Sequence, residues 1–264
     1  MFSAGRNEMG PEVTPERVLA LSRLVAMQPD MTVTEIQDYL SLKADGEGKN
    51  YINKVLKTAK EELHLIKSEN GKYVLNVPAT VLETVSAFRR YVADVVYRNE
   101  DSAFFKANAD FIAQNEKILS LHKLDEYAAE LNGGLLLQEN DIKGWRFWMR
   151  FLGQAYQYEM TLIPNMAIRL RDVMQSIDCE NKPLACNEFV QWMRQNLPEV
   201  RTSIKRSECL PLSLSNGLRS LRDAGYIDLG DIGDAEHVEL YPLQNIQERF
   251  SHVIIKEALY YELG

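Results

Sequence analysis

Cysteine and histidine are scarce in this chain of 264 residues, which has three cysteines and four histidines. The cysteines, Cys179, Cys186 and Cys209, are odd in number and far apart. A structural zinc site needs closely spaced Cys or His pairs that place two ligands on one turn. The sequence therefore predicts no metal site and three reduced thiols, as is usual in a cytoplasmic protein.

Long apolar runs and catalytic motifs are also absent from the sequence. No stretch approaches the roughly 18 consecutive apolar residues of a membrane span, and the first residues lack the apolar region of a secretory signal. The phosphate-binding, dinucleotide-binding, nucleophile-elbow and HExxH patterns do not occur. We therefore expect a cytoplasmic protein that is not an enzyme, takes no cofactor and does not enter a membrane.

The net charge of −8 is spread unevenly along the chain. Residues 1–80 carry −1, residues 81–180 carry −4 and residues 181–264 carry −3. Acidic surfaces repel the phosphates of nucleic acids. Only the first of these segments is therefore close to the charge balance that nucleic-acid binding favours.

Residues 14–77 show the element order of a small DNA-binding module. After a predicted flexible tail at 1–13, Thr14-Pro15 is a helix start, and further helices are expected at 35–42 and 50–63. Asn70-Gly71 between two alternating runs predicts a β-hairpin. Three short helices followed by a hairpin resemble the winged helix-turn-helix superfamily. The resemblance implies that the third helix enters the DNA major groove and that the hairpin, or wing, contacts the flanking backbone.

The same pattern is expected to recur near the end of the chain. Residues 78–158 predict an all-helical middle domain, residues 159–244 predict three helices and a second wing, and residues 245–264 predict a closing helix. The second wing is expected to pair strands at 226–229 and 237–241. The predicted fold class is therefore mainly α with small β-wings, with two winged helix-turn-helix domains flanking an all-α middle domain.

The third helix of the first module has two chemically different faces. Ile52, Val55 and Leu56 lie on an apolar arc that faces the core, whereas the opposite face carries amides and lysines. Amides pair with adenine, and lysines contact guanine or phosphate. Together with two wing lysines, these residues predict contacts to double-stranded DNA by Asn50, Asn53, Lys54, Lys57, Thr58, Lys60, Lys67 and Lys72.

The second module has an acidic wing. From Asp223 to Glu248 there are seven acidic residues and no lysine or arginine, and such a wing is repelled by a phosphate backbone. This favours a partner protein over DNA, although DNA contact through the nearby basic residues stays open. The second DNA or partner surface is predicted at Arg201, Lys205, Arg206, Ser215, Asn216, Arg219 and Arg222.

An aromatic segment at 141–158 allows two interpretations. Aromatic and arginine residues together can stack on single-stranded bases. However, Trp145, Trp148, Met149 and Leu152 form one helical stripe, which is typical of a buried core. The core interpretation is favoured.

The segments GWRFWMRFLG (144–153) and IPNMAIRLRD (163–172), with the order of the modules, resemble DpdG-like accessory subunits of the bacterial defence system associated with 7-deazaguanine DNA modification. The resemblance implies a cytoplasmic subunit of a larger DNA-acting assembly that senses or restricts foreign DNA.

Three classes of function compete at this point. The first is a DNA-binding adaptor, whose first module grips duplex DNA and whose second module holds protein subunits of a larger complex. The second is a transcriptional regulator that acts as a homodimer and binds two half-sites about 34 Å apart. The third is a structural subunit similar to the tandem winged-helix proteins of SMC complexes. We favour the adaptor.

Overall fold

The computed structural model of the chain describes residues 1–3, 10–40, 46–131, 137–177, 182–204, 209–244 and 246–260, without the side chains of 46–48. It is a mixed α/β structure, 54% helical, with small antiparallel sheets. This confirms the coarse prediction of a mainly helical chain with small sheets. The chain divides into two compact units, Met1–Phe105 with Gly134–Phe151, and Lys106–Gly133 with Leu152–Gly264.

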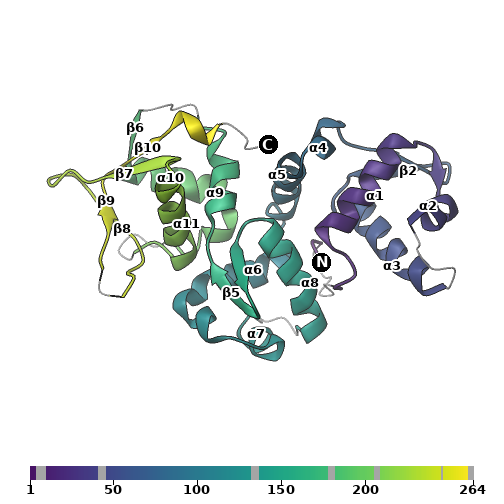
Figure 1. Cartoon of the computed structure of the whole chain (residues 1–264), viewed down its shortest axis with the longest axis horizontal. Helices are drawn as coiled ribbons and strands as arrows, with labels where there is room; N and C mark the ends of the chain where they lie inside the picture. The colour runs from purple at the N-terminus through teal and green to yellow at the C-terminus, as the bar shows by residue number, and fades with distance from the viewer. Residues whose placement is uncertain are drawn as a thin grey trace. The chain divides into compact units, whose positions relative to one another are not determined.

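The first part of the first unit consists of helices and the three strands of a small sheet (Figure 1). The elements are α1 (Pro15–Met27), β1 (Met31–Thr32), α2 (Val33–Leu40), α3 (Gly46–Lys57), the π-helical turn η1 (Thr58–Glu62), β2 (Ile66–Glu69) and β3 (Lys72–Leu75). α1 begins as predicted, because the Thr14 hydroxyl accepts a hydrogen bond from the Arg17 backbone N–H at 3.4 Å and Pro15 occupies the first helical position.

The sheet of this unit is antiparallel and has the strand order β1–β3–β2. Asn70 (φ 52°) and Gly71 (φ 79°) form the turn between β2 and β3, which confirms the predicted hairpin. β1 pairs with the other side of β3, with Met31 opposite Tyr73. The sequence pattern does not predict β1, since two residues are too few to show an alternation.

A helical core completes the first unit, with α4 (Thr80–Glu83), α5 (Val85–Val96), the start of α6 (Ala103–Gln114) and α8 (Glu139–Phe151). Trp145, Trp148 and Met149 of α8 are fully buried. The Trp148 indole N–H donates a hydrogen bond to the Val13 carbonyl oxygen at 2.7 Å. These residues of the aromatic stripe therefore belong to the buried core, which is the interpretation favoured from the sequence. They are not available to stack on bases.

The first two residues of the chain also belong to this core. The Phe2 ring packs edge-on against Phe104, with the ring centroids 5.1 Å apart. The Met1 ammonium lies 3.1 Å from the buried Glu62 carboxylate, which also accepts the Phe2 backbone N–H at 2.6 Å. The predicted flexible tail at 1–13 is thus wrong for Met1 and Phe2. Burial of a large aromatic side chain outweighs the loss of chain freedom there.

The second unit starts with the rest of α6, η2 (Asn115–Ser120) and α7 (Leu124–Glu130), followed by a hairpin of β4 (Ala155–Tyr158) and β5 (Thr161–Pro164). The hairpin corrects the predicted helix at 141–158, because α8 ends at Phe151. At Gly153 the backbone has φ +76°, and a Cβ there would lie 2.7 Å from the Arg169 backbone nitrogen. Residues 78–158 are therefore not all helical, and they contribute to both units.

A second set of helices and strands follows the hairpin. It consists of α9 (Ala167–Met174), β6 (Pro183–Ala185), α10 (Cys186–Asn196), η3 (Pro198–Val200), α11 (Leu212–Asp223), β7 (Ile227–Gly230), β8 (Val238–Glu239), β9 (Arg249–Phe250), β10 (His252–Ile255) and η4 (Glu257–Leu259). α9 and α11 approach closely at Gly217, where a Cβ would lie 2.9 Å from the Met166 carbonyl carbon.

The strand pairing corrects two predictions about the second wing. β7 pairs with β10 and β8 pairs with β9, so strands 226–229 and 237–241 do not form the expected hairpin. The expected helix at 245–264 is wrong as well, and the module extends past residue 244. Val253 and Ile255 are buried, whereas His252 and Ile254 are less so, and this period of two is that of a strand.

The two units contain one topology twice. In the first unit the order is α1–β1–α2–α3–β2–β3, with the sheet order β1–β3–β2. In the second unit it is α9–β6–α10–α11–β7–β10, with the sheet order β6–β10–β7. The difference lies between the last two strands. A two-residue turn joins β2 to β3, whereas residues 231–251, here called the insert, join β7 to β10 and contain β8 and β9.

The buried tryptophan of α8 provides a test of the first core. We expect Trp148→Ala to lower the free energy of unfolding by about 3–5 kcal/mol, because it leaves a large cavity and an unpaired Val13 carbonyl. The neighbouring Phe147 is 41% exposed, and Phe147→Ala serves as the control, with an expected loss below about 1 kcal/mol. Urea unfolding measures both, and equal losses would contradict the packing described.

Candidate nucleic-acid interface

α3 has the two faces that the sequence predicts. Ile52, Val55 and Leu56 are buried, which fixes the rotation of the helix against the core. On the other side Asn50, Asn53, Lys54 and Lys57 are exposed. The structure therefore brings these four predicted residues together on one accessible surface. Lys67 and Lys72 are exposed on the β2–β3 hairpin of the same unit.

Thr58 and Lys60 depart from this arrangement. They lie in η1, where the wider π-helical turn replaces the regular spacing on which the prediction rests. Thr58 is 5% exposed, so its assignment as a DNA-contacting residue is wrong. Lys60 is half-buried and offers less of its side chain to a ligand.

The lysines of this surface differ in their partners. Lys54 forms an ion pair with Glu12, which precedes α1, and Lys67 pairs with Glu69 at 2.7 Å. Lys57 makes no ion pair with any residue that the structure describes. The Lys54 and Lys67 side chains are 59% and 51% exposed. Exposed pairs of this kind contribute less than about 1 kcal/mol and weaken with salt, so an external anion can replace either carboxylate.

The ion pair also perturbs Glu12. A hydrogen bond from Lys54 outweighs the effect of partial burial and holds the pKa of the Glu12 carboxyl below its ordinary value. Glu12 is consequently charged at neutral pH and competes for Lys54. Nothing in the sequence points to Glu12, because 42 residues separate it from Lys54.

A second missed residue lies on α2. The Gln37 side-chain amide donates a hydrogen bond to the Asn53 Oδ1 atom at 2.7 Å, and both side chains are exposed or nearly so. Arg17 lies over the Tyr51 ring, 5.0 Å from its centroid. These contacts orient the start of the exposed α3 face, and only the folded chain reveals them.

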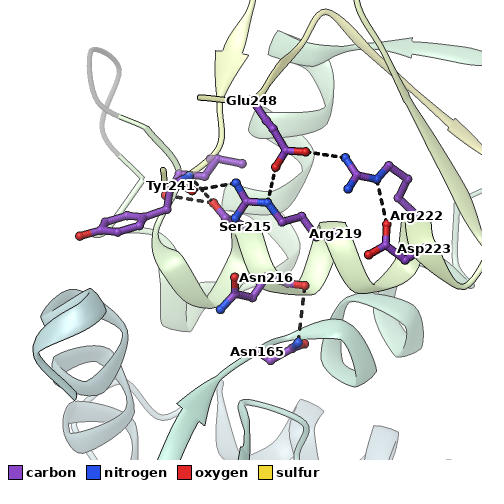
Figure 2. Close-up of polar contacts among 9 residues, drawn as sticks. Asn165, Ser215, Asn216, Arg219, Arg222, Asp223, Tyr241 and Glu248 are labelled. Atoms are coloured by element: carbon purple, nitrogen blue, oxygen red, sulfur yellow. Dashed lines mark hydrogen bonds and ion pairs between the residues drawn. The ribbon is translucent and has the colours of Figure 1, made fainter. Parts of the chain in front are cut away.

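The predicted second surface is different, because most residues of α11 are buried. Figure 2 shows the polar contacts that its side chains make. Ser215 is buried and Arg219 is 6% exposed, which corrects the expectation that both face outward. Asn216 donates a side-chain hydrogen bond to the Pro164 carbonyl oxygen at 2.9 Å. Arg201 is exposed. Lys205 and Arg206 lie outside the described residues.

The insert covers this helix through polar contacts. Glu248 accepts hydrogen bonds from Arg219 Nε and from Arg222 Nη1, the latter at 2.9 Å. Arg219 Nη2 also donates to the Tyr241 carbonyl oxygen at 2.8 Å, and the Tyr241 backbone N–H donates to Ser215 Oγ at 2.8 Å. Glu248, an acidic residue of the insert, is thus paired with arginines of the same unit. A count of charged residues along the sequence does not reveal this contact.

In the described part of the chain, the His, Cys, Asp and Glu side chains form no group of three or more that could hold a metal ion. Cys186 is buried, and burial raises the pKa of its thiol, which disfavours the reactive thiolate. Of the helices described, none has the length and apolar character needed to cross a membrane.

No model of a known protein family, no curated protein and no solved structure matches this chain.

The contacts of Glu248 predict a pH-dependent contribution to stability. Burial raises the pKa of this carboxyl, but hydrogen bonds from Arg219 and Arg222 outweigh burial and leave the pKa below its ordinary value. A lowered folded-state pKa contributes stability above the unfolded value of about 4.3, and this contribution is lost as the pH falls through the folded value. We expect Glu248→Gln to cost about 1.5–3 kcal/mol at neutral pH.

The difference between wild type and Glu248→Gln should shrink toward zero in acid, below a pH of about 4. Urea unfolding at a series of pH values measures it. Glu239→Gln is the control, since Glu239 is exposed and forms no ion pair with a described residue. A difference that persists unchanged at low pH would contradict the assigned contacts.

Proposed function

We propose that this chain is a non-catalytic, cytoplasmic DNA-binding adaptor, a subunit of a bacterial multi-component defence system. In this proposal each repeated module is a winged helix-turn-helix domain. The first contacts duplex DNA, and the second holds a partner protein. The observation that carries the proposal is the repeated topology, with the third-helix surface open in the first module and covered in the second.

The first module has the features that duplex binding needs. A recognition helix must present polar side chains outward while its apolar face is anchored, and α3 does so with Asn53, Lys54 and Lys57. Asn53 is an amide suited to adenine, and the lysines neutralise phosphates. Lys67 and Lys72 on the hairpin occupy the wing, where contact with the flanking backbone is expected.

The second module supports the protein-binding part of the proposal. Arg219 and Arg222 are already paired with Glu248, and the insert carries further exposed acids such as Asp234 and Glu239. Like charges disfavour the approach of a phosphate backbone to this surface. The defence-system setting rests on the resemblance of the 144–153 and 163–172 segments described above.

Fluorescence anisotropy with a labelled random-sequence duplex tests DNA binding. With one phosphate each for Lys54, Lys57 and Lys72, the affinity is expected to fall about fortyfold between about 50 and about 200 mM salt. We expect the triple variant Lys54→Glu, Lys57→Glu, Lys72→Glu to lose binding, because all three side chains are exposed on the proposed interface.

The matched control replaces three exposed lysines elsewhere, Lys117, Lys123 and Lys143, by glutamate. It makes the same change in net charge and should keep most of the affinity. Absence of wild-type binding at low salt would refute the proposal, and so would equal losses in the two triple variants.

Glu12 generates a separate prediction, because it competes with phosphate for Lys54. We expect Glu12→Gln to tighten duplex binding by up to about fivefold at low salt, which corresponds to an exposed ion pair of at most about 1 kcal/mol. Glu16→Gln, in the first turn of α1, makes the same charge change without releasing Lys54. Equal effects of the two substitutions in the anisotropy assay would show that only net charge matters.

A further inference from the structure

α11 occupies the same position in its module as α3 does in the first, since each is the third helix and leads into a sheet of the same strand order. α3 presents Lys54 and Lys57 to solvent, whereas on α11 Arg219 is buried and the Arg222 side chain is 35% exposed. Arg219 and Arg222 are one helical turn apart on α11, and both side chains contact one carboxylate, that of Glu248 (Figure 2).

The contact comes from the part of the second module that the first module lacks. Glu248 and Tyr241 both belong to the insert, whose counterpart in the first unit is a two-residue turn. The sheet of the second module pairs β6, β10 and β7 without the insert. The insert is therefore an addition to the module whose acidic side chain lies on the basic residues of the third helix.

Arg222 has a second carboxylate, since its Nε atom donates to Asp223 Oδ1 at 3.1 Å, but Glu248 is the one carboxylate that the structure shows on Arg219 among the described residues. Arg219 is 6% exposed, and among the described residues its Nη1 atom has no hydrogen-bond partner. A buried guanidinium N–H without an acceptor costs free energy. A cavity of about 520 Å³ is lined by Arg222 of α11, Leu229 of β7 and six residues of the insert, namely Asp231, Glu239, Leu240, Gln247, Glu248 and Arg249. Its two basic side chains therefore face three acidic ones. Arginine pairs of this kind match the several oxygens of a phosphate.

We propose that Arg219 and Arg222 form a second, latent site for DNA phosphates on α11, which Glu248 occupies as an internal anion. The inference goes beyond the proposed function, which assigns DNA to α3 alone. In the closed state the second module is restricted to protein contacts. Displacement of Glu248 from the two arginines exposes a second basic helix face, so that both modules of one chain engage phosphates.

The test uses the full chain with the α3 interface removed, so its outcome does not depend on the first module. In the Lys54→Glu, Lys57→Glu, Lys72→Glu background we add Glu248→Gln and measure anisotropy with a labelled random-sequence duplex. We expect binding about tenfold tighter than the background at low salt, with a log–log salt slope steeper by about two because two phosphates are neutralised.

Two further substitutions make the result specific to the arginine pair. Asp234→Asn in the same background removes one acidic charge from the insert at an exposed position outside the cavity, and it should leave binding unchanged. Arg222→Ala added to Glu248→Gln should abolish the gain. Circular dichroism checks that each variant is folded.

Glu248→Asp is the second route if Glu248→Gln does not fold. It keeps a charge beside Arg219 but shortens the side chain, so both contacts weaken and a smaller gain in binding is expected. The proposal is overturned if the folded Glu248 variants bind no more tightly than Asp234→Asn. It is equally overturned if the gain survives Arg222→Ala, or if the background already binds DNA through α11.

Discussion

The pairing of the Glu248 carboxylate with Arg219 determines what the second module presents to other molecules. Arg219 is 6% exposed, and a guanidinium removed from water is tolerated only when an anion and hydrogen-bond acceptors lie within reach. Both are provided by the insert, through Glu248 and the Tyr241 carbonyl oxygen. The insert must therefore fold onto α11, and in doing so it covers the face that α3 leaves open in the other module.

The two modules show how burial changes the strength of an ion pair and its availability to an external anion. Lys54 and Glu12 form an ion pair between side chains that are 59% and 26% exposed, whereas the Arg219 side chain in its pair with Glu248 is 8% exposed. Water and salt weaken the first pair. In the second, loss of one partner leaves a buried charge uncompensated. One basic helix is thus available to an external anion, and the other is closed by an internal one.

Local signals in the sequence predicted many elements but not their partners. The Thr14 cap, the Asn70-Gly71 turn and the apolar arc of α3 were predicted because each depends on neighbours a few residues away. The pairing of β7 with β10 is not predictable in the same way. The insert separates the two strands, and nothing in the sequence of either strand identifies its partner. The predicted flexible tail includes Phe2, because a single aromatic residue near the N-terminus forms no repeating apolar pattern that would indicate a buried position.

The sequence by itself determined the mainly helical class, the start of α1, the β2–β3 hairpin, and the exposed position of Asn53, Lys54 and Lys57. These follow from local backbone preferences and from the spacing of apolar residues. Only the tertiary structure decided that Thr58 is buried and that Glu12 contacts Lys54. It alone also decided that Glu248 closes α11, because such contacts depend on where distant parts of the chain meet, and burial then sets how strong each charge pair is.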